Sequence, residues 1–135
     1  MKGKFIAGSG DEGTASVIEI AGEQYECMDC LGYGRSRSCK PGDVVYVAFS
    51  AGLVKSDRRG NVVAGANPQQ RKALDPLGGW HYRAYGAVVS VAPSGTVLDC
   101  GAVTVEMPAV LGADAIGSFV AVDIDRLDCW RTRQR

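Results

Sequence analysis

The chain has 135 residues, of which 46% are hydrophobic, a length and composition that fit one globular domain and exclude a disordered chain. Lysine and arginine number 15, as do aspartate and glutamate, so the formal net charge is zero. This balance argues against strong sequence-independent binding of nucleic acid, which usually requires a positive excess to neutralise phosphates.

Apolar residues in the first part of the chain recur mainly at every second position, which predicts β-strands rather than helices. The expected strands are short and are separated by glycine-containing turns. They cover residues 4–7, 15–20, 24–28 and 44–50. The first three indicate a meander. The fourth is apolar on both faces, so we expect it to lie at the centre of a sheet.

Residues 51–80 interrupt this alternation and predict one long connection. Asn67 is a suitable helix cap, Pro68 suits the first helical position, and Asp75-Pro76 stops a helix. We therefore expect a helix of at most two turns within the connection. A connection of this length in a compact domain is usually either functional or mobile.

Strand signals return in the last third of the chain. The expected strands cover residues 82–91, 96–100, 102–107 and 118–124, the last continuing through a bulge to Trp130. A short helical turn is expected within residues 109–116. The order of strands and glycine turns resembles that of the first part, so residues 3–50 and 84–130 are candidate pseudo-repeats joined by residues 51–83. The alternative is that such similarity is common to all β proteins in which glycine turns separate short strands.

The strand order of each half, which ends on Gly42-Asp43-Val44-Val45-Tyr46-Val47 and on Gly117-Ser118-Phe119-Val120-Ala121-Val122, resembles that of oligonucleotide-binding (OB) small barrels. The resemblance implies an all-β fold, with one or two small barrels of six to eight short strands in a single β domain over residues 1–135. It extends to architecture and does not carry a function.

Aromatic and basic residues alternate at one predicted strand start, and a smaller set lies in an earlier loop. Such a pattern suits stacking on bases and contact with phosphates. The candidate ligand-binding residues are Tyr33, Arg35, Arg37, Trp80, Tyr82, Arg83 and Tyr85. The alternative is that Trp80 and one of the tyrosines are core aromatics, which strands favour in general.

Five cysteines and one histidine offer a second candidate site. Cys27, Cys30, Cys39 and His81 supply four residue types that zinc accepts, but their spacing is not that of paired Cys-x-x-Cys ligands. The alternative is buried cysteines that act as small apolar residues. We therefore predict no metal and no cofactor. An odd cysteine count without a secretion signal, and no membrane-spanning apolar run, predict reduced thiols in a soluble, cytoplasmic protein.

No nucleophile stands in a recognisable catalytic motif, and no glycine-rich phosphate loop is present. The sequence therefore predicts a non-enzymatic β-barrel binding module, with single-stranded nucleic acid as the first ligand class to test. The alternative is a structural or assembly protein, such as a phage or multisubunit component, that acts through protein partners or self-association. A membrane partner is not expected.

Overall fold

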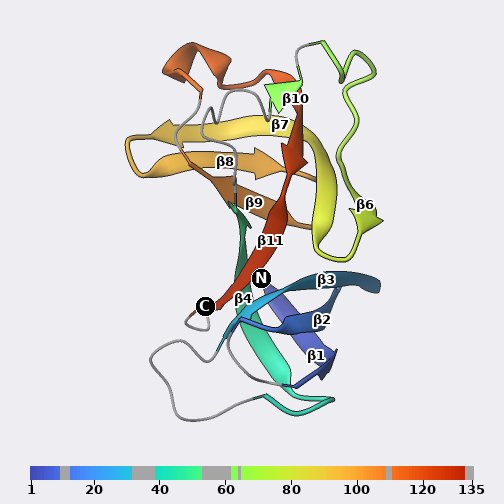
Figure 1. The fold of residues 1–135 in the computed structure, drawn as a ribbon. Coiled ribbons are helices and arrows are strands. Elements are labelled where there is room, and N and C mark those ends of the chain that lie inside the picture. Colours follow the sequence, from blue (N-terminus) through green and yellow to red (C-terminus); the bar gives the residue numbers. More distant parts are fainter. Residues whose placement is uncertain (10–12, 32–38, 53–61, 64, 109–110, 133–135) are drawn as a thin grey trace.

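The computed structural model describes residues 1–9, 13–31, 39–52, 62–63, 65–108 and 111–132, and these fold into one continuous sheet of eleven strands (Figure 1). The elements are β1 (Lys2–Gly8), β2 (Ala15–Ile20), β3 (Glu23–Cys30), β4 (Val44–Gly52), β5 (Val62–Val63), β6 (Ala73–Gly78), β7 (His81–Ala92), β8 (Gly95–Asp99), β9 (Thr104–Met107), the single-turn 3-10 helix η2 (Ala113–Ala115), β10 (Phe119–Ile124) and β11 (Arg126–Arg131). The all-β prediction is confirmed.

Five strands form the closed barrel, in the lower part of Figure 1. Their order is β1-β2-β3-β11-β4, and β4 pairs with β1 to complete the ring. All these pairings are antiparallel except that of β3 with β11, which is parallel. The fifth strand therefore comes from the far end of the chain. The OB-like barrel is present, but residues 3–50 do not complete it alone.

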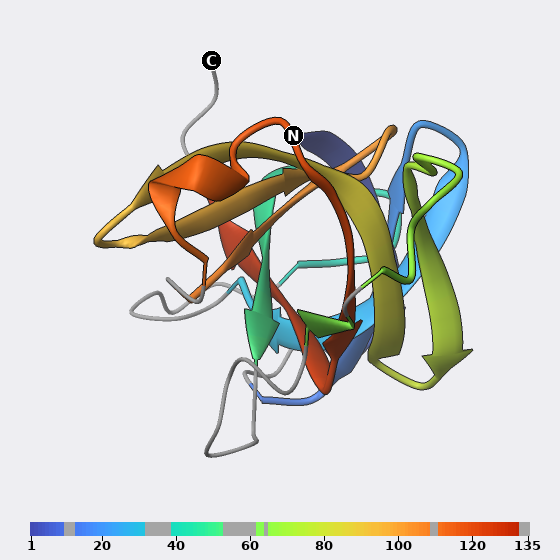
Figure 2. The same cartoon turned by 90° about the horizontal axis from the view of Figure 1, so that it is seen from above.

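The remaining strands form the upper sheet, in the order β9-β8-β7-β10-β5, with β6 added on β7. Seen from above, β6 lies on the outside of β7 (Figure 2). The upper sheet joins the closed barrel where β4 pairs in parallel with β9, at Phe49 opposite Val105. β4 thus contacts three strands, which confirms its expected central position.

The two sets of strands repeat one pairing order. The pairing order β4-β1-β2-β3 in the closed barrel corresponds to the pairing order β10-β7-β8-β9 in the upper sheet. The last strand of each series pairs in parallel with a strand from the other half of the chain, β3 with β11 and β9 with β4. An internal duplication with exchanged strands would produce this arrangement, and the duplication of residues 3–50 and 84–130 stays a prediction.

Alternation along the strands builds a single apolar core that spans both sets. Val45, Val47 and Phe49 of β4 are at most 1% exposed, while their neighbours face outward. The ring of Phe49 packs edge-on against Tyr25, with ring centroids 5.4 Å apart. Because β4 runs through the joint, its inward face contributes to the core under both the closed barrel and the upper sheet.

The helix expected over residues 67–75 is wrong. Asn67 instead closes a turn: its side-chain oxygen accepts from the Arg71 N–H at 2.8 Å, and its amide donates to the Val120 carbonyl at 3.2 Å. The chain then forms β6, with Pro76 on an outer strand that tolerates a missing N–H. Pairing with β7 has overridden the local helix signals.

The connection predicted over residues 51–80 is therefore partly strand, since β4 extends to Gly52 and β5 and β6 follow. Residues 53–61 lie outside the described part of the chain. The segment expected as one bulged strand is divided into β10 and β11, which pair with different partners. These differences account for more strands than the six to eight expected. Within the described ranges, no helix has the length and apolar character needed to cross a membrane.

Candidate functional site

The predicted aromatic and basic cluster is divided by the alternation of β7. Tyr82 points inward, is 3% exposed, and donates its hydroxyl to the Glu26 carbonyl of β3 at 2.8 Å. Burial raises the pKa of Tyr82 to about 12. Tyr82 is thus a core aromatic, as the alternative interpretation held, and its ring is not available for stacking on a base.

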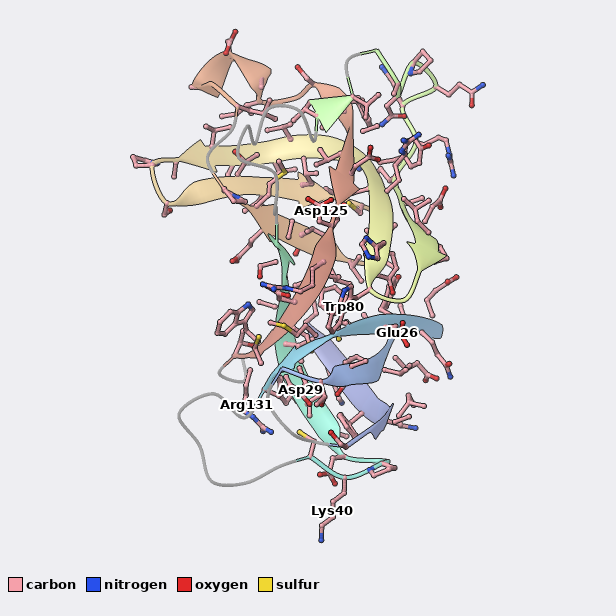
Figure 3. The ribbon with its side chains drawn as sticks, viewed as in Figure 1. Glu26, Asp29, Lys40, Trp80, Asp125 and Arg131 are labelled. Carbon is pink, nitrogen blue, oxygen red and sulfur yellow. The ribbon has the colours of Figure 1, made fainter. Side chains whose placement is uncertain are left out.

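Trp80 lies in the turn between β6 and β7, at the waist between the closed barrel and the upper sheet (Figure 3). It is half-buried, and its carbonyl accepts from the Leu127 N–H of β11 at 2.9 Å. The other predicted set, Tyr33, Arg35 and Arg37, lies outside the described residues.

Arg83 and Tyr85 face outward from β7, but each already has a partner. The Arg83 guanidinium pairs with Asp123 of β10 at 2.7 Å, and this hydrogen bond raises the pKa of Arg83. The Arg71 guanidinium lies 4.3 Å from the centre of the Tyr85 ring and pairs with Asp75 at 3.1 Å. The cluster is consequently neutral, and a phosphate would have to displace a carboxylate to reach either arginine.

The face that OB barrels use for oligonucleotides lies on the second and third strands of the barrel. In this chain the alternation of β2 and β3 directs Ala15, Val17, Glu19, Gln24, Glu26 and Met28 outward. None of these side chains is cationic or aromatic. The outer face of β2 and β3 therefore provides neither a phosphate partner nor a stacking surface.

The residues considered for zinc do not converge. The Cys27 sulfur donates to the Cys129 sulfur at 2.9 Å, and this contact, with burial, raises the pKa of Cys27. Cys39 is half-buried and accepts from the Arg131 guanidinium at 2.9 Å, whereas His81 is exposed at the start of β7. Across the described ranges, no three His, Cys, Asp or Glu side chains are grouped to hold a metal ion.

A cavity of about 640 Å³ is lined by the β7–β8 hairpin and by the ends of β4 and β9. This volume is typical of small-molecule sites, which span roughly 300–1,000 Å³. The described lining contains four hydroxyl side chains and one carboxylate: Ser50, Ser90, Ser94, Thr96 and Glu106. We refer to this hollow as the hydroxyl cavity.

Strand register assembles the hydroxyl cavity from distant parts of the chain. Ser50 of β4 lies opposite Glu106 of β9, Glu106 opposite Val97 of β8, and Val97 opposite Ser90 of β7. These residues form one row across four strands. The hairpin turn approaches β9 closely at Gly95, whose φ is +153° and where a Cβ would lie 2.6 Å from the Met107 carbonyl oxygen. Only glycine fits there without strain.

Hydroxyl groups in the hydroxyl cavity retain hydrogen-bonding capacity. The Trp130 indole donates to the Ser50 hydroxyl at 2.9 Å, which leaves the hydroxyl proton of Ser50 to donate. The Thr96 hydroxyl, by contrast, is fully buried on the inward face of β8 and has no hydrogen-bond partner among the described residues.

The sequence analysis did not identify the hydroxyl cavity. Pro93-Ser94-Gly95 indicated only a turn, and Ser50, Ser90 and Glu106 lie on three strands that are far apart in the chain. The available signal was the alternation that turns Ser50 and Glu106 outward from buried strands. No protein-family model, curated protein or solved structure matches the chain, so the interpretation of the hydroxyl cavity depends on its own geometry.

Proposed function

We propose that the protein is a non-enzymatic binding module and that the hydroxyl cavity is its binding site. The ligand is a hydrogen-bonding group without negative charge. One observation carries this proposal: the described lining of the hydroxyl cavity combines three serine hydroxyls that reach the surface with a single carboxylate and contains no lysine, arginine or histidine.

Hydroxyl side chains both donate and accept hydrogen bonds, so they complement amide and polyol groups. The carboxylate of Glu106 repels an anion, and no cation in the described lining offsets it. Apolar residues of the same lining, including Val97 and Pro93, offer surface for methylene groups. This mixture of apolar lining and a few polar groups is typical of ligand pockets.

Single-stranded nucleic acid, the first ligand class expected from the sequence, is supported less well. Arg71 and Arg83 are paired with carboxylates, Tyr82 is buried, and the outer face of β2 and β3 lacks cations. The assembly alternative agrees better with the hydroxyl cavity, because a segment of another polypeptide presents amide groups that serine hydroxyls bind.

A binding role without catalysis is supported by what lines the hydroxyl cavity. Glycoside hydrolysis normally uses two carboxyl groups, and Glu106 is the single carboxylate of the described lining. A serine nucleophile needs a base within hydrogen-bond reach. The recorded partner of the Ser50 hydroxyl is the Trp130 indole, and none is recorded for the Ser90 and Ser94 hydroxyls. The one histidine, His81, is not among the described lining residues.

Proton–nitrogen correlation NMR with three small probes tests the proposal. N-methylacetamide and methyl glucoside, which are neutral, should shift the backbone amides of Ser50, Ser90, Thr96 and Glu106. Dimethyl phosphate, which mimics the nucleic-acid backbone, should shift them least. Shifts that fall mainly outside the hydroxyl cavity, or a preference for dimethyl phosphate, would contradict the proposal.

A pair of adjacent variants provides the control. Ser90→Trp places a large ring in the hydroxyl cavity and should abolish the shifts. Val89→Trp, at the neighbouring residue, is the control, because Val89 is 49% exposed and does not line the cavity, so the shifts should remain unchanged. Equal loss in both variants would indicate a general disturbance of β7 and would count against the cavity as the site.

A further inference from the structure

Glu106 differs from nearby carboxylates in having no cation beside it. Four aspartates at the upper sheet and its junction with the closed barrel each contact a basic side chain, at distances of 2.6–3.1 Å. These pairs are Arg71–Asp75, Lys72–Asp99, Arg83–Asp123 and Arg126–Asp128. Glu106 takes part in no ion pair within the described ranges.

The immediate surroundings of Glu106 are neutral. Its cross-strand neighbours are Ser50 of β4 and Val97 of β8, and neither can offset its charge. On the neighbouring strand β11, the cation Arg126 is engaged by Asp128, whose side chain is only 7% exposed. The negative charge of the hydroxyl cavity therefore has no partner among the residues that the structure describes.

We propose that the hydroxyl cavity binds an alkylammonium group, that of a lysine side chain on a partner polypeptide, with Glu106 as its counter-ion. This inference rests on the proposed function and names its ligand. An ammonium carries three donors and no acceptor, and the carboxylate and the serine hydroxyls supply acceptors from different strands. A compact ammonium suits such scattered acceptors better than the planar fork of an arginine.

The lining also fits the rest of a lysine residue. Val97 and the two prolines of the lining, Pro93 and Pro108, offer apolar surface to the methylene stem. Ser94 lies in the turn of the β7–β8 hairpin and is exposed, so its hydroxyl is accessible to a flanking peptide group. A free amine would leave these contacts unused, which favours a polypeptide as the source of the ammonium.

Two probes, with and without the charge on the lysine side chain, measure the contribution of that charge to binding. Nα-acetyl-lysine N-methylamide carries the ammonium, and its Nε-acetylated form has the same stem without the charge. At neutral pH and low salt, NMR titration should show about two- to fivefold tighter binding of the charged probe, the size expected for an exposed ion pair. Added salt should reduce the difference, because it screens exposed charges.

Two variants test whether Glu106 causes the preference for the charged probe. Glu106→Gln keeps the shape of the side chain and should remove the preference for the charged probe. Glu19→Gln, on the outer face of β2, should leave that preference intact. Glu106 is exposed, so the substitution does not disturb the core. Equal binding of the two probes, or a preference that survives Glu106→Gln, would overturn the inference.

Other probes distinguish a failure of this inference from a failure of the proposed function. If N-methylacetamide shifts the amides of the hydroxyl cavity but the charged lysine probe gains nothing, the lysine inference fails and the binding site stands. If no neutral probe shifts those amides, the proposed function itself fails. Butylamine tests the source: binding as tight as that of the lysine probe would assign the site to free amines and overturn the polypeptide partner.

Discussion

The hydroxyl of Tyr82 should stabilise the junction between the upper sheet and the closed barrel, since it joins β7 to the Glu26 carbonyl of β3 at 2.8 Å. Tyr82→Phe keeps the buried ring and removes this hydrogen bond. A hydrogen bond of this type contributes about 0.5–1.5 kcal/mol, so the free energy of unfolding should fall by that amount. Tyr82→Ala also removes the ring and should cost about 3–5 kcal/mol.

The same hydroxyl makes stability depend on alkaline pH. Its pKa is about 12 in the folded protein, against the ordinary value of 10.0. The unfolded chain loses this proton first, so the contribution of Tyr82 to stability should be constant below about pH 10 and fall between about pH 10 and pH 12. The fall attributable to Tyr82 should approach roughly 2–3 kcal/mol and be absent from Tyr82→Phe.

Urea denaturation of the wild type and both variants, followed by circular dichroism at several pH values, measures these effects. Tyr85→Phe is the matched control, because Tyr85 lies on the same strand with its ring outward against Arg71. It should change stability by less than about 0.5 kcal/mol. A cost of Tyr82→Ala no greater than that of the control would refute the assignment of Tyr82 to the core.

Three further predictions concern nucleic-acid binding, the turn at Gly95 and the reactivity of the cysteines. Labelled single-stranded DNA and RNA should show no anisotropy change with the protein at low salt; salt-sensitive binding that Arg83→Ala weakens would contradict the neutral cluster. Gly95→Ala should cost more than Gly117→Ala in denaturant melts, because both have positive φ but only Gly95 meets a backbone oxygen; equal costs would contradict the close approach. In the native protein, the half-buried Cys39 should react with a maleimide before the four buried cysteines do, and peptide mass spectrometry would identify the labelled residue. Earlier labelling of one of the buried cysteines would contradict its place in the core.

The sequence by itself was sufficient to predict strands and their inward faces. Period-two alternation is a property of the extended backbone, so residues 44–50 indicated both β4 and its central position. The same alternation places Tyr82 and Arg83 on opposite faces of β7, although the sequence analysis treated them as one cluster. The alternation of the sequence therefore already contained the information that divides this cluster between the two faces of β7.

Tertiary structure decided the elements whose partners lie far along the chain. Residues 67–75 carry the signals of a short helix, yet residues 73–78 form β6 because β7 supplies a pairing partner. Residues 126–131 looked like the continuation of one strand, yet β11 leaves β10 and closes the barrel between β3 and β4. Local propensities are small, and the pairing of whole strands outweighs them.

The candidate site belongs to the second category. Ser50, Ser90 and Glu106 are ordinary outward residues on their own strands, and no spacing between them signals a site. They become one surface only through the register of β4 with β9, of β9 with β8 and of β8 with β7. Register is set by the packing of inward faces across the whole sheet, so it is a property of the folded chain and not of any one segment.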